Sequence, residues 1–228
     1  MSENNGQSKK DILKDLNAVK TGGKFLTRVV GTNDVFCKES FSDEERMIFE
    51  AMSDYATNEL LPMSQKELNT KDEKLIRKLV EQMGELGFLG VDVPEKYGGS
   101  EMTKTGMCIL AEGISKSGSP SFCTVWNVQT SIGSLGIIWY GNDEQKKRWL
   151  PGISSGKKIA AFGLTEPEAG SDATNSKTTG VLSDDGKHYI LNGQKIFISN
   201  GGWADIFTVA LKIDGKFSSI VVEKGTPG

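Results

Sequence analysis

The spacing of apolar residues changes near Lys157, and this change most constrains how the 228-residue chain can fold. Before Lys157, apolar side chains recur at helical spacing, most clearly over residues 75–86, which predicts helices. After Lys157, short apolar segments are separated by turn-forming residues, which predicts strands. Because the strands follow the helices and do not alternate with them, the pattern favours an α+β fold over a Rossmann-type sheet.

The helical half divides into five expected helices. Gly87 can cap the second of them, and Gln145, three residues after Asn142, marks the start of the fifth. The expected helices run from Ser42 to Pro62, over 75–86, 103–116 and 120–140, and from Asn142 to just before Pro151. We therefore predict an N-terminal extension over residues 1–41 and a helical domain over 42–157.

The remaining residues, 158–228, are predicted to form an antiparallel, barrel-like β domain. The dipeptide Asn192-Gly193 suits a type I′ turn, which predicts a hairpin over 187–199. The expected strands cover 158–165, 176–182, 187–191, 194–199, 205–213 and 217–223. The chain ends directly after the last of these strands, so we expect the β domain to be incomplete.

Composition excludes several classes of protein. Apolar residues make up 37% of the chain, enough for a folded core. The net charge of −3 argues against a dedicated nucleic-acid binder. The three cysteines are widely spaced and form no metal-binding or disulfide pattern, which suits a reducing compartment. We find no secretory signal and no apolar run long enough for a transmembrane helix, so we expect a cytoplasmic protein, with peripheral membrane association as an alternative.

A first candidate site lies in residues 162–172, FGLTEPEAGSD, where an apolar strand runs into a small, polar turn. Gly170 lets the backbone approach a ligand closely. Amides near Gly170 and Ser171, with the Ser171 hydroxyl, can form a concave anion site. Backbone groups near Leu164 and Thr165 can face the polar edge of a flat heterocycle. An ordinary strand-to-loop turn remains the alternative.

A second candidate site is FISNGG, residues 197–202. Phe197 and Ser199 are two positions apart, so on the expected strand they share a face. An aromatic ring beside a hydroxyl can flank a planar cofactor. The alternative is a core phenylalanine next to a serine at the end of a strand. His188, the single histidine, is expected to face solvent on a strand.

Together these blocks resemble the acyl-CoA dehydrogenase family. LTEPEAGSD (164–172) and YILNGQKIFISNGGWADIFTV (189–209) are similar to its middle β domain. ELGFLGVDVPEKYGG (85–99) and GNDEQKKRWLPGISSGKKIAAFGLTEP (141–167) are similar to its helical half and the lead-in to its flavin site. The resemblance covers residues 42–228 and is nearest to the very-long-chain branch. The family's C-terminal helical bundle has no counterpart in this sequence.

The resemblance implies an FAD cofactor and names the residues that would contact it. Ser171 matches a serine near both the FAD pyrophosphate and the acyl-CoA. Phe197 stands where many members have a tryptophan against the flavin, and Ser199 where a threonine or serine donates to flavin N5. The implied cofactor-binding residues are Phe162, Gly163, Leu164, Thr165, Gly170, Ser171, Phe197, Ile198 and Ser199.

The implied reaction is α,β-dehydrogenation of a fatty acyl-CoA in fatty-acid β-oxidation. Its glutamate base lies in the family's C-terminal domain, and Glu166 matches a structural position in the turn. We therefore expect no catalytic base and no metal site in this chain, and no activity from the chain alone. Implied partners are a long-chain acyl-CoA, an electron-transferring flavoprotein as acceptor, and further copies of the subunit. An acyl-CoA oxidase-like flavoprotein and a non-catalytic truncated fragment remain alternatives.

The preferred acyl-chain length stays open in the sequence. The uncharged stretch 120–136 resembles the helix that lines the family's acyl pocket. Its small residues can leave a deep slot, whereas Trp126 can fill one; the small residues are Thr124, Val128, Gly133 and Gly136.

Overall fold

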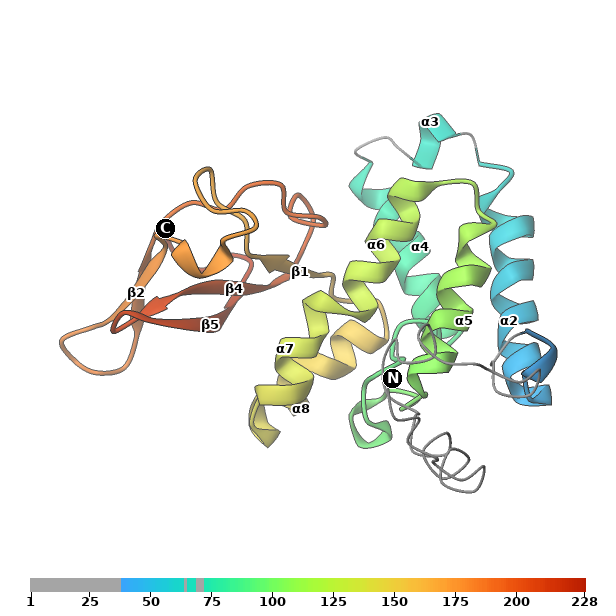
Figure 1. The fold of residues 1–228 in the computed structure, drawn as a ribbon, viewed down its shortest axis with the longest axis horizontal. Helices are drawn as coiled ribbons and strands as arrows, with labels where there is room; N and C mark the ends of the chain where they lie inside the picture. The colour runs from blue at the N-terminus through green and yellow to red at the C-terminus, as the bar shows by residue number, and fades with distance from the viewer. Residues whose placement is uncertain (1–37, 64, 69–71) are drawn as a thin grey trace, which may run out of the picture. The chain divides into compact units, whose positions relative to one another are not determined.

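The computed structural model describes residues 38–63, 65–68 and 72–228. The chain divides into two compact units, 1–42 and 43–228. In the first unit the structure describes a short 3-10 helix, η2, at Lys38–Ser40. Most of the expected extension over 1–41 lies outside the described residues. The second unit has helices followed by a sheet, as Figure 1 shows, which confirms the α+β class.

The helices of the second unit lie close to their expected positions. None of the helices in the described ranges has the length and apolar character that a membrane span requires. The elements are α2 Asp43–Tyr55, continued by the π-helix η3 Ala56–Leu60, α3 Gln65–Leu68, α4 Glu73–Glu85, the 3-10 helix η4 Glu95–Tyr97, α5 Lys104–Ser115, α6 Pro120–Thr130, α7 Ile132–Tyr140 and α8 Asp143–Ser154.

Local sequence explains where several helices begin and end. Asn142 and Gln145 form a reciprocal capping box at the start of α8, which confirms the expected start of that helix. Gly87 follows α4 with a φ of 78°, the left-handed conformation that stops a helix and that glycine adopts without strain. Side-chain caps on α4, α5 and α6 come from Asp72, Thr103 and Ser119.

Two expected helix boundaries were wrong. The stretch 120–140 is two helices, because Ser131 leaves the helical conformation between α6 and α7. Gly133 then packs against β1 (Ala160–Gly163), where an added Cβ would lie 2.9 Å from the Cβ of Ala160. In addition, α8 runs through Pro151 to Ser154. Burial of Ile153 offsets the hydrogen bond that the proline removes.

Trp126 belongs to the core of the helical part. It is 1% exposed, and its Nε1 donates to the backbone oxygen of Phe88 at 2.9 Å. The core cluster around it includes Met52, Leu79 and Leu110. Trp126 therefore fills space between the helices. Any open slot for an acyl chain on α6 lies away from this side chain.

The sheet has five strands, in the order β1-β4-β2-β3 with β5 also paired to β4. On β4, β1 pairs with the first half and β2 with the last two residues, whereas β5 pairs along the whole strand. The strands are β1 Ala160–Gly163, β2 Thr179–Leu182, β3 Tyr189–Asn192, β4 Ile206–Ile213 and β5 Lys216–Glu223. β1 and β2 pair with β4 in parallel, whereas β2–β3 and β4–β5 are antiparallel. The expected antiparallel barrel is thus corrected to a mixed, open sheet. The long connection from β1 to β4 permits a parallel pair, which no tight turn could join.

The expected hairpin over 187–199 was also wrong. β3 pairs with β2, and the turn between them lies at 183–188, where the Ser183 amide donates to the backbone oxygen of His188 at 2.8 Å. The His188 side chain is exposed. Gly193 passes so close to Thr178 that an added Cβ would lie 2.3 Å from the threonine Oγ1. Residues 194–199 form no strand, since their backbone and side chains join the segment after β1.

Gln129 connects the helices to the sheet. Its fully buried amide accepts from the Ala160 amide at 2.8 Å and donates to the oxygens of Ile153 and Lys158 at 3.0 and 2.8 Å. One side chain from α6 thereby fixes the end of α8 and the start of β1. Because every polar atom of the buried amide is used, the path of β1 out of the helices is firmly set.

Candidate functional site

The turn after β1 presents two predicted site residues to solvent. Glu166 and Ala169 exchange backbone hydrogen bonds of 3.0 and 3.2 Å, which closes the turn. Gly170 and Ser171 follow it and are exposed. A Cβ built on Gly170 would meet no atom within 4 Å, so a ligand can approach this backbone closely. The anion site at Gly170 and Ser171 stays a prediction.

A buried ion pair holds this turn against residues 194–199. The Nζ of Lys195 lies 2.7 Å from Oε1 of Glu166 and 2.9 Å from the backbone oxygen of Leu164. Their side chains are 11% and 5% exposed. One residue on, the Ile196 amide donates to the Thr165 oxygen at 2.9 Å. We call the Glu166–Lys195 pair the buried joint, because it brings the two predicted blocks together.

Glu166 is saturated with donors. Its carboxylate accepts from the amides of Lys177 and Thr178 at 2.6 and 3.0 Å, and from the Thr178 hydroxyl at 2.5 Å. Burial by itself raises the pKa of Glu166, but the hydrogen bonds from Lys195, Thr178 and Lys177 outweigh it and lower the pKa to about 2. A carboxylate held ionised by four donors is a structural anchor, in accord with its expected role.

The second block is a strained loop and not a strand. Phe197 and Asn200 have φ angles of 56° and 65°, in the left-handed region that few non-glycine residues adopt. Phe197 is 89% exposed, an unusual place for a phenylalanine without a partner. Ile198, next in sequence, packs against the core of the helical part. Phe197 and Ser199 thus do not share a strand face, which corrects the expectation from their spacing.

Ser199 opens onto a groove of about 550 Å³, here called the Ser199 groove. The loop forms one wall, and helices α3, α4 and α6 supply the other residues. Among the described residues, those lining the groove include no carboxylate and no histidine. They are Leu68, Ile76, Ser121, Thr124, Val125, Ile198, Ser199, Asn200, Gly201, Gly202 and Trp203.

Of the small residues suggested for a slot, Thr124 alone lines this groove. Val128 is buried, Gly133 packs on β1, and Gly136 faces the Thr208 methyl at 3.2 Å from an added Cβ. Gly133 therefore allows α7 to pack closely on β1, whereas Gly136 lines a separate groove between α7 and the sheet.

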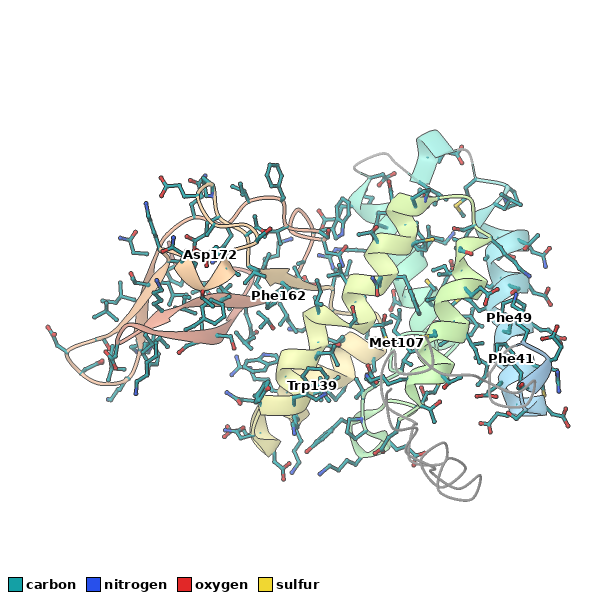
Figure 2. All side chains as sticks on the ribbon, in the orientation of Figure 1. Phe41, Phe49, Met107, Trp139, Phe162 and Asp172 are labelled. Carbon is teal, nitrogen blue, oxygen red and sulfur yellow. The ribbon has the colours of Figure 1, made fainter. Side chains whose placement is uncertain are left out.

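Phe162 lies in a different groove, of about 510 Å³, between α7 and the sheet. Figure 2 labels Phe162 on the strand side and Trp139 on the helix side of it. Its other aromatic members are Tyr140 and Phe217. The structure thus separates the Phe162 side chain from Ser199, although the backbones of their segments are joined through Thr165 and Ile196.

Sequence reasoning missed three residues that shape the site. Lys195 lies within the segment 189–209 that resembles the family, but no role was assigned to it from the sequence. Its charge, opposite to that of Glu166, was the one feature that could have suggested the pair. Asn200 donates from Nδ2 to the oxygens of Val125 and Ala160 at 3.2 and 3.1 Å. Arg77 reaches the same loop from α4, and no local pattern marks it.

Comparison with known proteins shows which family has these two segments. A family model described as the acyl-CoA dehydrogenase N-terminal domain matches residues 42–157, and the middle-domain model matches residues 161–228. The chain belongs to the acyl-CoA dehydrogenase family. The paired blocks around the buried joint therefore lie within the middle domain of that family.

Relatives are similar over most of this chain. A probable acyl-CoA dehydrogenase of Bacillus subtilis (strain 168) is 44% identical over 211 residues, which are 92% of this chain and 35% of the relative. The very long-chain specific acyl-CoA dehydrogenase of Rattus norvegicus is 37% identical, over 85% of this chain and 29% of the relative. The chain thus spans about a third of these relatives' length.

A solved structure shows the same arrangement. The crystal structure of an acyl-CoA dehydrogenase complexed with FAD from Bacillus anthracis superposes with a TM-score of 0.83 at 43% identity. The match covers 90% of this chain and 35% of that one. This likeness supports the mixed sheet and the helical part as one family fold.

Proposed function

We propose that this chain forms the N-terminal and middle parts of an FAD-dependent acyl-CoA dehydrogenase. The observation that carries the proposal is the buried joint, which holds an exposed glycine-serine turn beside the loop that presents Phe197 and Ser199. We infer the division into an extension (1–41), a helical domain (42–157) and a middle domain (from 158). Membership of the family supports the general reaction.

The residues present suit the cofactor. Gly170 leaves open space for close backbone approach, and Phe197 offers an exposed aromatic face. Bound flavin supplies the hydride acceptor for forming a double bond in an acyl-CoA. We propose that the cofactor-binding residues are those implied by the sequence: Phe162, Gly163, Leu164, Thr165, Gly170, Ser171, Phe197, Ile198 and Ser199.

Each segment has its own proposed task. The Ser199 hydroxyl donates a hydrogen bond to the flavin edge, and Ser171 binds near the pyrophosphate and the acyl-CoA. The Ser199 groove, whose helical side includes the apolar side chains of Leu68, Ile76 and Val125, holds acyl carbons and keeps water from them. Glu166 does not remove the substrate proton, because four donors hold its carboxylate. We propose that the base comes from a part of the protein other than residues 38–63, 65–68 and 72–228.

The proposal extends to the substrate and to the electron acceptor. The likeness to very-long-chain relatives favours long-chain acyl-CoA, and the family reaction requires an electron acceptor, for which an electron-transferring flavoprotein is proposed. A homo-oligomer and a cytoplasmic location remain predictions from the sequence.

The test is the absorption spectrum of the purified protein that contains this chain, before and after reconstitution with FAD. We expect a bound flavin that palmitoyl-CoA bleaches anaerobically. A colourless protein that takes up no FAD would contradict the assignment. Rapid reoxidation of the reduced flavin by oxygen would instead favour the oxidase-like alternative.

A further inference from the structure

The loop that carries Ser199 needs external support, because two of its residues are strained. Left-handed φ angles at Phe197 and Asn200 each cost about 1–3 kcal/mol and persist only where surrounding contacts hold them. Asn200 supplies contacts at the centre of the loop through Val125 and Ala160. The far end of the loop, Trp203 to Asp205, is held by a residue of the helical part.

That residue is Arg77, on α4. Its Nη2 donates to the backbone oxygen of Trp203 at 2.6 Å. The same guanidinium forms a forked pair with Asp205, with Nη1 at 2.9 Å from Oδ2 and Nη2 at 3.1 Å from Oδ1. Arg77 is separated from these partners by more than a hundred positions in sequence. We call this arrangement, Arg77 with Asp205 and the Trp203 oxygen, the Arg77 clamp.

Neighbouring groups hold the clamp rigid. Glu73, one turn before Arg77, accepts from its Nε at 2.8 Å and so orients the guanidinium plane. Asp205 also accepts from the Ile159 amide at 2.8 Å, just before β1. The Lys224 amide, after β5, donates to the backbone oxygen of Asp205 at 2.8 Å. The clamp therefore ties one helix to both edges of β4 and to the end of the loop.

The chemistry of the clamp requires arginine. A planar guanidinium can serve the Asp205 carboxylate, the Trp203 oxygen and Glu73 at once, whereas an ammonium group is a point charge without the fork. The Arg77 side chain is 30% exposed and that of Asp205 is 22% exposed, so the pair is partly shielded from water. Hydrogen bonding to Asp205 raises the pKa of Arg77, which keeps it charged at all accessible pH values.

We propose that Arg77 is a positioning residue that sets the place of the Ser199 hydroxyl from the helical part of the chain. Arg77 itself lies outside the residues that line the Ser199 groove, and it acts through the Trp203–Asp205 end of the loop. The inference rests on the proposed function for the role of Ser199. The clamp itself can be tested without any cofactor.

The first experiment measures hydrogen exchange by mass spectrometry in the cofactor-free protein, over peptides that span residues 199–205. The amides of Trp203 and Ala204 donate to the Asn200 oxygen at 3.0 and 2.8 Å, so their exchange reports loop order. In Arg77→Ala we expect exchange there to be about tenfold faster, which corresponds to about 1.4 kcal/mol of local opening free energy. Arg46→Ala, on the exposed pair with Asp43, is the matched control and leaves these peptides unchanged.

The second experiment is a double-mutant cycle on the rate of flavin reduction by acyl-CoA, with Arg77→Ala and Ser199→Ala. If Arg77 positions Ser199, the slowing caused by Ser199→Ala largely disappears in the Arg77→Ala background. A purely structural role would leave the two effects additive, and additivity would overturn the proposal. Unchanged exchange over 199–205 in folded Arg77→Ala would overturn it as well.

Arg77→Lys keeps the protein testable if the alanine variant does not fold. Lysine retains the charge and most of the stem but loses the fork, so loop exchange between that of wild type and tenfold faster supports the clamp. Wild-type exchange in Arg77→Lys would contradict the need for a fork. If the protein binds no FAD, the proposed function fails, while the exchange result still decides whether the clamp orders the loop.

Discussion

The Nζ of Lys195 lies 2.7 Å from Oε1 of Glu166, and both side chains are shielded from solvent. This contact joins the turn after β1 to the residues that lead into the Ser199 loop. It therefore connects two segments that the sequence marks separately. The joint also explains why 194–199 leaves the sheet, because Lys195 and Ile196 both bond to the segment 164–166.

Removing the cation of the joint should destabilise the fold. Lys195→Met leaves Glu166 buried without its charged partner, and we expect a loss of about 3–5 kcal/mol in the free energy of unfolding. Urea denaturation of the purified protein measures this loss. Lys177→Met is the control, because Lys177 pairs with Glu168 at the surface and should leave the urea midpoint unchanged. Equal effects of the two substitutions would contradict a special role for the joint.

The acid stability of the protein should depend on Glu166. Its pKa is lowered from an ordinary value of 4.5 to about 2, so the folded state binds its proton more weakly than the unfolded state does. The stability it contributes is therefore complete above pH 4.5 and is lost as the pH falls toward about 2. Urea midpoints measured between these pH values should fall more steeply in wild type than in Glu166→Gln. Parallel curves would show that the folded state does not lower the pKa of Glu166.

Ser199→Ala should slow flavin reduction without altering the fold. One neutral hydrogen bond contributes about 0.5–1.5 kcal/mol, so we expect a rate lower by roughly two- to tenfold. Stopped-flow absorbance of the flavin with saturating acyl-CoA gives the rate. Ser121→Ala, on α6 at the opposite wall of the same groove, is the matched control and should change the rate less. Identical rates in wild type and Ser199→Ala would place the hydroxyl away from the flavin.

Residues 1–228 alone should not oxidise acyl-CoA. The described lining of the Ser199 groove offers no carboxylate, and Glu166 is held by four donors, so no base is placed for the α-proton. An electron-acceptor assay with excess FAD and palmitoyl-CoA measures this. Turnover comparable to that of a complete family member would show that a base lies within this chain.

The sequence by itself determined the α+β class, most helix positions, the ends of the longer strands and the family. These follow from local signals: periodic apolar residues for α4, a capping box for α8, and the paired motifs around Glu166 and Ser199. Each of these signals spans only a few neighbouring residues, so it can be recognised in the sequence without knowledge of the fold. The structural role of Glu166 was also anticipated, through the resemblance to the family.

Only the tertiary structure decided the sheet's mixed pairing, the break at Ser131 and the loop conformation of 194–199. Asn192-Gly193 suits a hairpin locally, but close packing on Thr178 and the bonds of Lys195 outweigh that preference. Arg77 shows the same limit, since nothing near it in sequence points to Trp203 or Asp205. Contacts between distant residues depend on how the chain packs, and local propensities of about 1 kcal/mol or less cannot specify them.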